Sequence, residues 1–207
     1  EIPKSVLTIG ARAFYGCKSL VTLAFEANST LTEIKGSAFY SCESLSAINL
    51  PASVKKVGAY AFNGCKSATE FKFGNGSDAL IEGIGDYAFY DCVAFSTLDF
   101  GKYDNLKLIG EYAFSTCTEA TSIIIPVTVT TELNAFQSCK KMAKLYYLGT
   151  SEQFALLLDN DLNNGEIYGD NIAITNPRVK RYFYSANTPM EEGYFWRYDS
   201  GVITEWE

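Results

Sequence analysis

The sequence Ala-Phe-x-x-Cys occurs six times in this chain, and it limits the possible folds more than any other feature. Successive copies are separated by 25, 23, 27, 25 and 22 residues, and their phenylalanines are Phe14, Phe39, Phe62, Phe89, Phe114 and Phe136. Self-similarity with a period of about 20–50 residues is typical of solenoids and related repeat folds. The sequence therefore predicts six stacked turns over residues 1–148, each built on the same pattern.

Apolar residues also recur at fixed distances from each phenylalanine. Nine residues after it come Leu23, Ile48, Phe71, Leu98, Ile123 and Leu145, and eleven residues after it come Phe25, Leu50, Phe73, Phe100, Ile125 and Tyr147. Along most turns these positions alternate with polar ones, which is the period of a strand with one buried face. Apolar positions five and eight residues before the phenylalanine predict a second short extended segment. We expect a parallel sheet to run along the stack, with one strand from each turn.

Glycine precedes four of the phenylalanines by four residues, at Gly10, Gly58, Gly85 and Gly110. Because glycine reaches backbone conformations closed to other residues, we expect a sharp bend there into a short helical turn that carries Ala-Phe-x-x-Cys. The phenylalanine and the cysteine, three residues apart, would both face inward on such a turn. In the sixth turn Thr131 and Glu132 stand where Ile-Gly is expected. Insertions near residues 28, 75–78 and 102–105 should form loops after the main strand.

The repeat ends after Leu148, and residues 149–207 are expected to form a small α+β cap over the end of the stack. Thr150 and Gln153 have the spacing of a capping box, which predicts a short helix through about residue 158. Strands are predicted over residues 179–184, 194–198 and 202–206. The aromatic residues of this segment fill the core of the cap, or alternatively form a platform for a sugar ring: Tyr182, Phe183, Tyr184, Tyr194, Phe195, Trp196, Tyr198 and Trp206.

One polar stretch, from Asp159 to Asp170, partly matches the spacing of a calcium-binding loop. Asp159, Asp161 and Asn163 have suitable spacing for oxygen ligands. However, Asn164 stands at the turn position where such loops have glycine, and Asp170 replaces the usual final glutamate. A solvated polar loop is the better interpretation.

Composition excludes several classes of function. Histidine is absent, which removes the commonest general base and the commonest zinc ligand. A net charge of −7 argues against a nucleic-acid partner, because such binding depends on clustered lysine and arginine. No apolar run approaches the roughly 20 residues of a membrane-spanning helix. The cysteines recur once per turn, so we interpret them as buried free thiols, with disulfides between neighbouring turns as the alternative. We therefore predict no enzyme activity, no cofactor and no metal site.

The repeat unit is most complete from Leu45 to Cys65, and it resembles that of the BspA-like leucine-rich repeat family. Parts of the tail, such as residues 146–150 and 193–196, resemble the end segment of such proteins from gut Bacteroidetes and Firmicutes. The resemblance implies a right-handed leucine-rich-repeat solenoid of the α/β repeat class, with a parallel sheet along the stack and short helical turns. It also implies secretion or attachment to the cell surface, and adhesion in a few members.

The outward positions of the main strands are the natural binding surface of a solenoid. The candidate ligand-binding residues there are Asn49, Glu70, Lys72, Thr97, Asp99, Ser122 and Tyr146. Their charges are mixed, and cross-strand pairing of Lys72 with Asp99 is the simpler explanation. We expect a non-catalytic adhesion module that binds a protein or glycan at a cell surface. The alternative is a passive spacer that displays another domain, since residues 2–6 match residues 50–54 and the chain begins inside a repeat.

Overall fold

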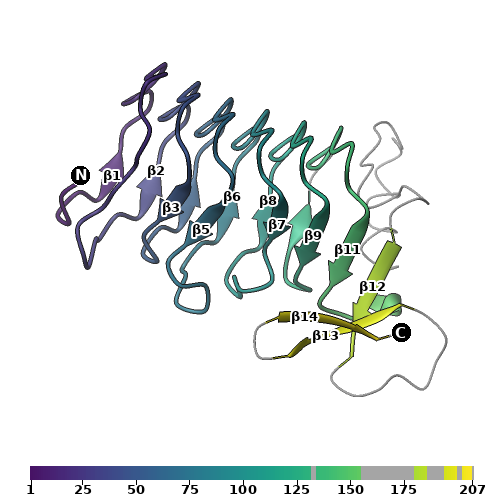
Figure 1. The fold of residues 1–207 in the computed structure, drawn as a ribbon. Coiled ribbons are helices and arrows are strands. Elements are labelled where there is room, and N and C mark those ends of the chain that lie inside the picture. Colours follow the sequence, from purple (N-terminus) through teal and green to yellow (C-terminus); the bar gives the residue numbers. More distant parts are fainter. Residues whose placement is uncertain (132–133, 155–179, 186–193, 200–201, 207) are drawn as a thin grey trace.

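The computed structural model describes residues 1–131, 134–154, 180–185, 194–199 and 202–206. These residues form a stack of six similar turns, and three further strands lie at the end of the stack that carries the sixth turn (Figure 1). The predicted solenoid of six turns is therefore confirmed.

Each turn contributes one two-residue strand to a parallel sheet along one side of the stack. The strands, in their order in the sheet, are β1 (Thr8–Ile9), β2 (Glu33–Ile34), β4 (Lys56–Val57), β6 (Gly83–Ile84), β8 (Leu108–Ile109) and β10 (Thr130–Thr131). The second residue of each strand is buried, and it is the apolar residue predicted five positions before the phenylalanine. In the sixth turn Thr131 takes this place and pairs with Ile109. The second extended segment is confirmed.

The strand predicted after each phenylalanine forms a second parallel arrangement. It comprises β3 (Ile48–Leu50), β5 (Phe71–Phe73), β7 (Thr97–Asp99), β9 (Ser122–Ile125) and β11 (Lys144–Tyr147). In β3 and β5 the first and third residues are buried and the middle residue is exposed, as the sequence pattern predicts. Turns follow β5 at residues 74–78 and β7 at residues 101–105, where the insertions were expected to form loops.

The segment Ala-Phe-x-x-Cys does not form the helical turn that its spacing indicates. In the described residues it is a series of tight turns, with left-handed residues two positions before and two positions after the phenylalanine, such as Tyr87 (φ 55°) and Asp91 (φ 59°). This backbone leaves the phenylalanine N–H free to donate to the alanine carbonyl of the next turn. The bond is 2.7 Å long from Phe62 to Ala88 and from Phe89 to Ala113. A helix would use that N–H within its own turn, so bonding between turns replaces helical bonding.

The phenylalanines of the repeat form a continuous stack through the core. Consecutive ring centroids lie 4.9, 5.0, 5.4, 4.9 and 6.0 Å apart, and the planes of neighbouring rings differ by at most 21°. Every ring of the stack except Phe14 is fully buried. Each such ring pair is worth about 0.5–1.5 kcal/mol beyond the burial of its apolar area. The stack therefore couples each turn to the next.

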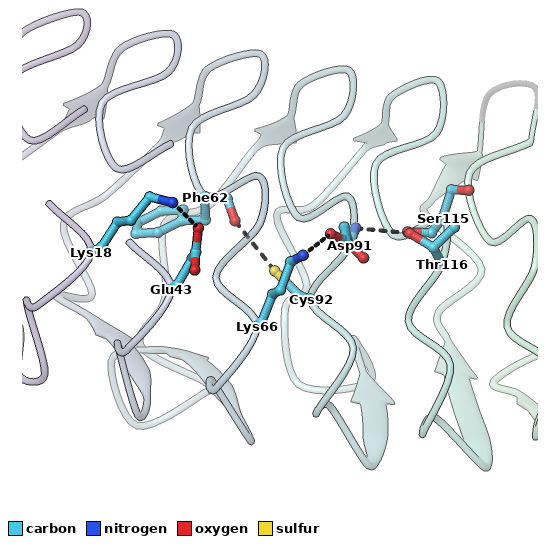
Figure 2. A network of polar contacts seen from close by, with 8 residues as sticks. All are labelled: Lys18, Glu43, Phe62, Lys66, Asp91, Cys92, Ser115 and Thr116. Carbon is cyan, nitrogen blue, oxygen red and sulfur yellow. Dashed lines mark hydrogen bonds and ion pairs between the residues drawn. The ribbon is translucent and has the colours of Figure 1, made fainter. Parts of the chain in front are cut away.

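The cysteines form a second column beside the phenylalanines, and all six are free thiols. Five of them donate a hydrogen bond from Sγ to the phenylalanine carbonyl of the preceding turn, such as Cys92 to Phe62 at 3.3 Å (Figure 2). Burial raises the pKa of the Cys42 thiol to about 11 and that of Cys92 well above its ordinary value. These thiols stay protonated and serve packing. The interpretation as structural thiols is confirmed, although Cys17 in the first turn is exposed.

The glycines before the phenylalanines have a different role from the one expected. Gly58, Gly85 and Gly110 do not adopt a left-handed conformation, so they do not serve a special bend. Instead, a Cβ on Gly85 would lie 2.8 Å from the Ala59 nitrogen in the preceding turn. Glycine is therefore needed because adjacent backbones approach closely here.

The C-terminal segment extends the outward sheet beyond the sixth turn. β12 (Lys180–Tyr184) pairs in parallel with β11, β13 (Phe195–Asp199) pairs in parallel with β12, and β14 (Val202–Trp206) pairs antiparallel with β13. All three predicted strands are present. The capping box is also formed, since the Thr150 N–H donates to Gln153 Oε1 at 2.9 Å and the Gln153 N–H donates to Thr150 Oγ1 at 3.3 Å. The helix is described over residues 151–154, and the proposed calcium loop lies outside the described residues.

Candidate binding face and the groove within it

Six of the seven candidate residues lie on the outward side of the main strands. Asn49 and Lys72 are exposed neighbours in β3 and β5, and their residues are paired in the sheet. Thr97 and Ser122 are likewise partners in β7 and β9, and the Ser122 hydroxyl donates to Thr97 Oγ1 at 3.4 Å. Neighbouring turns therefore bring polar side chains that are more than 20 residues apart in sequence into rows along one face.

Tyr146 is not exposed, so that part of the prediction is wrong. It is 5% exposed and packs with Ile124, Tyr182 and Trp196 in a separate apolar cluster formed by the added C-terminal strands. Its ring stacks on Tyr182 at 5.1 Å between centroids and meets Trp196 edge-on at 5.3 Å. The C-terminal strands thus cover the outward face of the last two turns. They also account for two of the aromatic residues there as core, whereas Tyr184 and Tyr194 remain exposed.

A polar cluster fastens this cover to the sheet. The Glu205 carboxylate on β14 accepts a hydrogen bond from the Tyr146 hydroxyl, and its Oε1 lies 2.6 Å from Lys144 Nζ. Burial alone would raise the pKa of Glu205, but hydrogen bonds from Lys144, Tyr146 and Tyr182 outweigh it and hold that pKa below its ordinary value. Burial and the bond to Glu205 together raise the pKa of Tyr146. The ionised form of Glu205 is therefore the one that stabilises the covered arrangement.

Acid should loosen the C-terminal strands before it affects the rest of the solenoid. Because the folded-state pKa of Glu205 is depressed, its contribution is present above the unfolded pKa of about 4.3 and is lost as the pH falls further. Glu205→Gln should cost about 1–2 kcal/mol at neutral pH, since it weakens charge-assisted bonds. Both tryptophans of the chain lie in β13 and β14, so urea denaturation followed by tryptophan fluorescence reports on this region.

Glu43→Gln is the matched control for this change. Glu43 pairs with Lys18 at 2.8 Å, but both side chains are well exposed, and exposed pairs contribute little to stability. The Lys18–Glu43 pair lies at the other end of the stack, far from the C-terminal strands (Figures 1 and 2). Equal denaturation midpoints for Glu205→Gln and Glu43→Gln would contradict the fastening role of Glu205.

The outward sheet is interrupted between the third and fourth turns. β3 and β5 form a sheet of two strands, whereas β7 belongs to the sheet that continues through β9 and β11 to the C-terminal strands. Within the described part of the chain, no backbone hydrogen bond joins residues 69–73 to residues 95–99. The opening is a groove of about 460 Å³, and its polar lining includes Glu70, Lys72, Asn75, Thr97, Asp99 and Lys102.

The interruption is confined to this side of the stack. On the other side β4 pairs with β6, and the Phe62 and Gly64 N–H groups donate to the next turn at 2.7 and 2.8 Å. The third and fourth turns are therefore joined along one edge and parted along the other, so that the solenoid opens as a wedge onto its outward face.

Large aromatic side chains hold the wedge open. The Phe71 ring lies 5.4 Å from both Phe95 and Phe114, so it reaches past the fourth turn to the fifth. Tyr103 is buried below the groove, with its ring perpendicular to Phe73 and its hydroxyl 3.4 Å from the Phe73 nitrogen. That hydroxyl takes the N–H that would otherwise pair with β7. Other turns carry smaller residues at several of these positions, and the longest spacing in the repeat, 27 residues, falls here.

Four candidate residues, Glu70, Lys72, Thr97 and Asp99, line this one groove. The expected cross-strand pair is not formed, because Lys72 pairs with Glu70 at 2.8 Å and the Asp99 carboxylate accepts from the Gly101 N–H at 2.9 Å. Burial raises the pKa of Asp99. Sequence reasoning missed the groove itself and the part of Tyr103 in it, although the long spacing and the run of aromatic residues were visible signals.

Comparison with known proteins places the chain in a family. The BspA type leucine rich repeat region, in 6 copies, matches residues 1–102 and 32–155. The chain belongs to the BspA-type leucine-rich repeat family. The resemblance seen in the sequence is confirmed, and BspA-type repeats are typical of binding or structural modules without catalysis. No curated protein matches the chain.

Three solved structures are similar to this BspA-type chain. A leucine rich repeat protein of T. pallidum is 28% identical with a TM-score of 0.52, over 61% of this chain and 57% of that one. A leucine rich cell surface protein of Faecalibacterium prausnitzii is 15% identical, over 72% and 68% of the two chains, with a TM-score of 0.34. A leucine-rich repeat protein of Bacteroides ovatus is 19% identical, over 69% and 59%, with a TM-score of 0.30. The chain thus spans little more than half of the T. pallidum protein.

Two searches of the described residues concern membranes and metals. No helix in this part of the chain has the length and apolar character needed to cross a bilayer. No group of three or more histidine, cysteine, aspartate or glutamate side chains in the described ranges is arranged to hold a metal ion.

Proposed function

We propose that this BspA-type solenoid is a non-catalytic binding module that acts outside the cell or at its surface, and that its ligand is a protein or a glycan. The observation that carries the proposal is the outward face of the main strands, where exposed polar side chains from successive turns stand in register. Such a face presents many weak contacts over a long surface, which is how solenoids bind their partners.

The face as proposed runs from β3 to β9 and includes Asn49, Glu70, Lys72, Thr97, Asp99 and Ser122. It stops short of β11, because the C-terminal strands bury Tyr146. Positive and negative side chains are mixed, so affinity would come from hydrogen bonds and fitted shape more than from net charge. A surface location fits the family, and the similar Faecalibacterium prausnitzii protein is described as a cell surface protein.

Binding to an array of host matrix proteins and glycans tests the proposal. The combined change Asn49→Ala, Lys72→Ala and Ser122→Ala should weaken binding about tenfold or more, because each lost hydrogen bond costs about 0.5–1.5 kcal/mol. The matched control is Lys56→Ala, Lys107→Ala and Thr130→Ala, three exposed positions in or beside the other sheet. Equal loss in both variants would refute this face, and the absence of any bound ligand would favour the passive spacer.

A further inference from the structure

We infer that the groove between β5 and β7 receives an extended peptide segment of a partner protein, which adds to the sheet as a strand. The inference rests on the proposed function and names the class of ligand for part of its face. It is carried by two facing strand edges that are each paired on their far side and unpaired toward the groove.

The backbone atoms that face the groove follow from the pairing of the other turns. In a parallel sheet each residue directs its N–H and its C=O to the same neighbouring strand, and successive residues alternate. The Ile48 N–H donates to the Glu70 carbonyl in the next turn at 3.0 Å, and Phe100 donates to Ile124 at 3.1 Å. By the same register, the N–H and C=O of Phe71 point from β5 toward β7, and those of Thr97 and Asp99 point from β7 toward β5.

These groups have no hydrogen-bond partner across the groove in the described structure. The Phe73 N–H is the exception on this edge, since the Tyr103 hydroxyl lies 3.4 Å from it. Unpaired strand edges are templates for another strand, because a backbone donor or acceptor that is removed from water without a partner costs free energy. A ligand that pairs with both edges at once would satisfy groups from two turns.

An extended peptide matches this arrangement better than a glycan does. Its own N–H and C=O groups repeat about every 6.6–6.8 Å on each side, which is the two-residue period of the edges themselves. The groove volume of about 460 Å³ is within the usual range of ligand sites, about 300–1,000 Å³. Glu70, Lys72 and Lys102 at its rim offer both charges to side chains of the inserted segment.

The two edges do not close on each other because the core below them is filled. Phe71 packs against Phe95 and Phe100, and Tyr103 packs against Phe73. Closing the wedge would require these buried rings to repack, whereas an inserted strand needs no such change. The groove is therefore prepared before the ligand arrives, which lowers the entropic cost of binding.

The test uses a phage-displayed library of short random peptides selected on the full chain. Selected peptides should slow the hydrogen exchange of the backbone amides of Thr97 and Asp99, which exchange freely without ligand. Exchange at Ser122, already paired with β7, should change little. Selected peptides that slow exchange only at other sheet edges, or a selection that yields no binding peptide, would overturn the inference.

A variant with a matched control sharpens the test. Thr97→Pro removes one N–H from the groove without removing a bond to β9, and it should weaken peptide binding about tenfold. Thr22→Pro makes the same change at the same position of the repeat in the first turn, and it should leave peptide binding unchanged. Loss of binding in Thr22→Pro with retention in Thr97→Pro would place the peptide on the wrong edge and refute the inference. If Thr97→Pro does not fold, the exchange measurement on the unaltered chain still decides.

Failure of this inference is distinct from failure of the proposed function. If an array ligand binds through Asn49, Lys72 and Ser122 but no peptide protects Thr97 and Asp99, the binding face stands and strand addition is wrong. If a peptide protects those amides while the face variant binds its array ligand normally, strand addition stands and the wider face is wrong.

Discussion

Phe89→Ala should destabilise the solenoid by about 3–5 kcal/mol, which is the usual cost of emptying a buried phenylalanine site. Phe89 is fully buried in the central part of the stack. Its ring stacks on Phe62 and Phe114 and also contacts Phe71 and Phe95. The alanine variant would therefore uncouple the third turn from the fifth as well as leave a cavity. Urea denaturation followed by far-ultraviolet circular dichroism measures the loss.

Phe14→Ala is the matched control, because Phe14 occupies the same position of the repeat in the first turn. Phe14 is only partly buried and stacks on one ring, that of Phe39. Its removal should cost clearly less, about 1–2 kcal/mol on the scale of partly buried apolar area. Similar losses for Phe14→Ala and Phe89→Ala would mean that stacking between turns does not carry the stability of the solenoid.

Gly85→Ala should destabilise the chain by about 3 kcal/mol, at the upper end of what overpacking costs. The added Cβ would meet backbone atoms of the preceding turn, 2.8 Å from Ala59 N, 3.0 Å from Gly58 C and 3.1 Å from Val57 O. Backbone cannot swing aside as a side chain can, so the third and fourth turns would have to separate. Thermal unfolding followed by circular dichroism would show a lower midpoint.

Gly10→Ala separates the two possible roles of this glycine. Gly10 occupies the same position of the repeat, but a Cβ there would have no atom within 4 Å. If glycine were needed for its backbone conformation, both variants would be destabilised alike. If it is needed because adjacent turns approach closely, Gly10→Ala should be neutral. A large loss in Gly10→Ala would restore the explanation by backbone bending.

The pattern of the repeat determined the number of turns, the buried columns and the positions of both strands. These features follow from residues that recur within one turn, and the same local pattern is satisfied six times. The capping box at Thr150 and Gln153 was predictable for the same reason, because both partners lie within four residues. The single cysteine in each turn also indicated a buried column rather than a disulfide framework.

The binding face was only partly predictable. Alternation along the strands placed Asn49, Lys72 and Thr97 correctly on the outward side. The same rule placed Tyr146 there too, but strands that follow more than 30 residues later in the chain cover it. The period of a strand tells which side a residue takes, and it contains no information about what packs against that side.

Three features were decided by the tertiary structure alone, and all three arise where one turn meets another. The backbone of Ala-Phe-x-x-Cys is not helical because its N–H groups bond to the neighbouring turn, and a spacing of three cannot distinguish that from a helix. Gly85 is required by a backbone from the preceding turn. The groove between β5 and β7 exists because Phe71 and Tyr103 fill the space beneath it. The repeated sequence thus specifies each turn, and the packing of unlike side chains between turns decides where the stack is closed and where it opens.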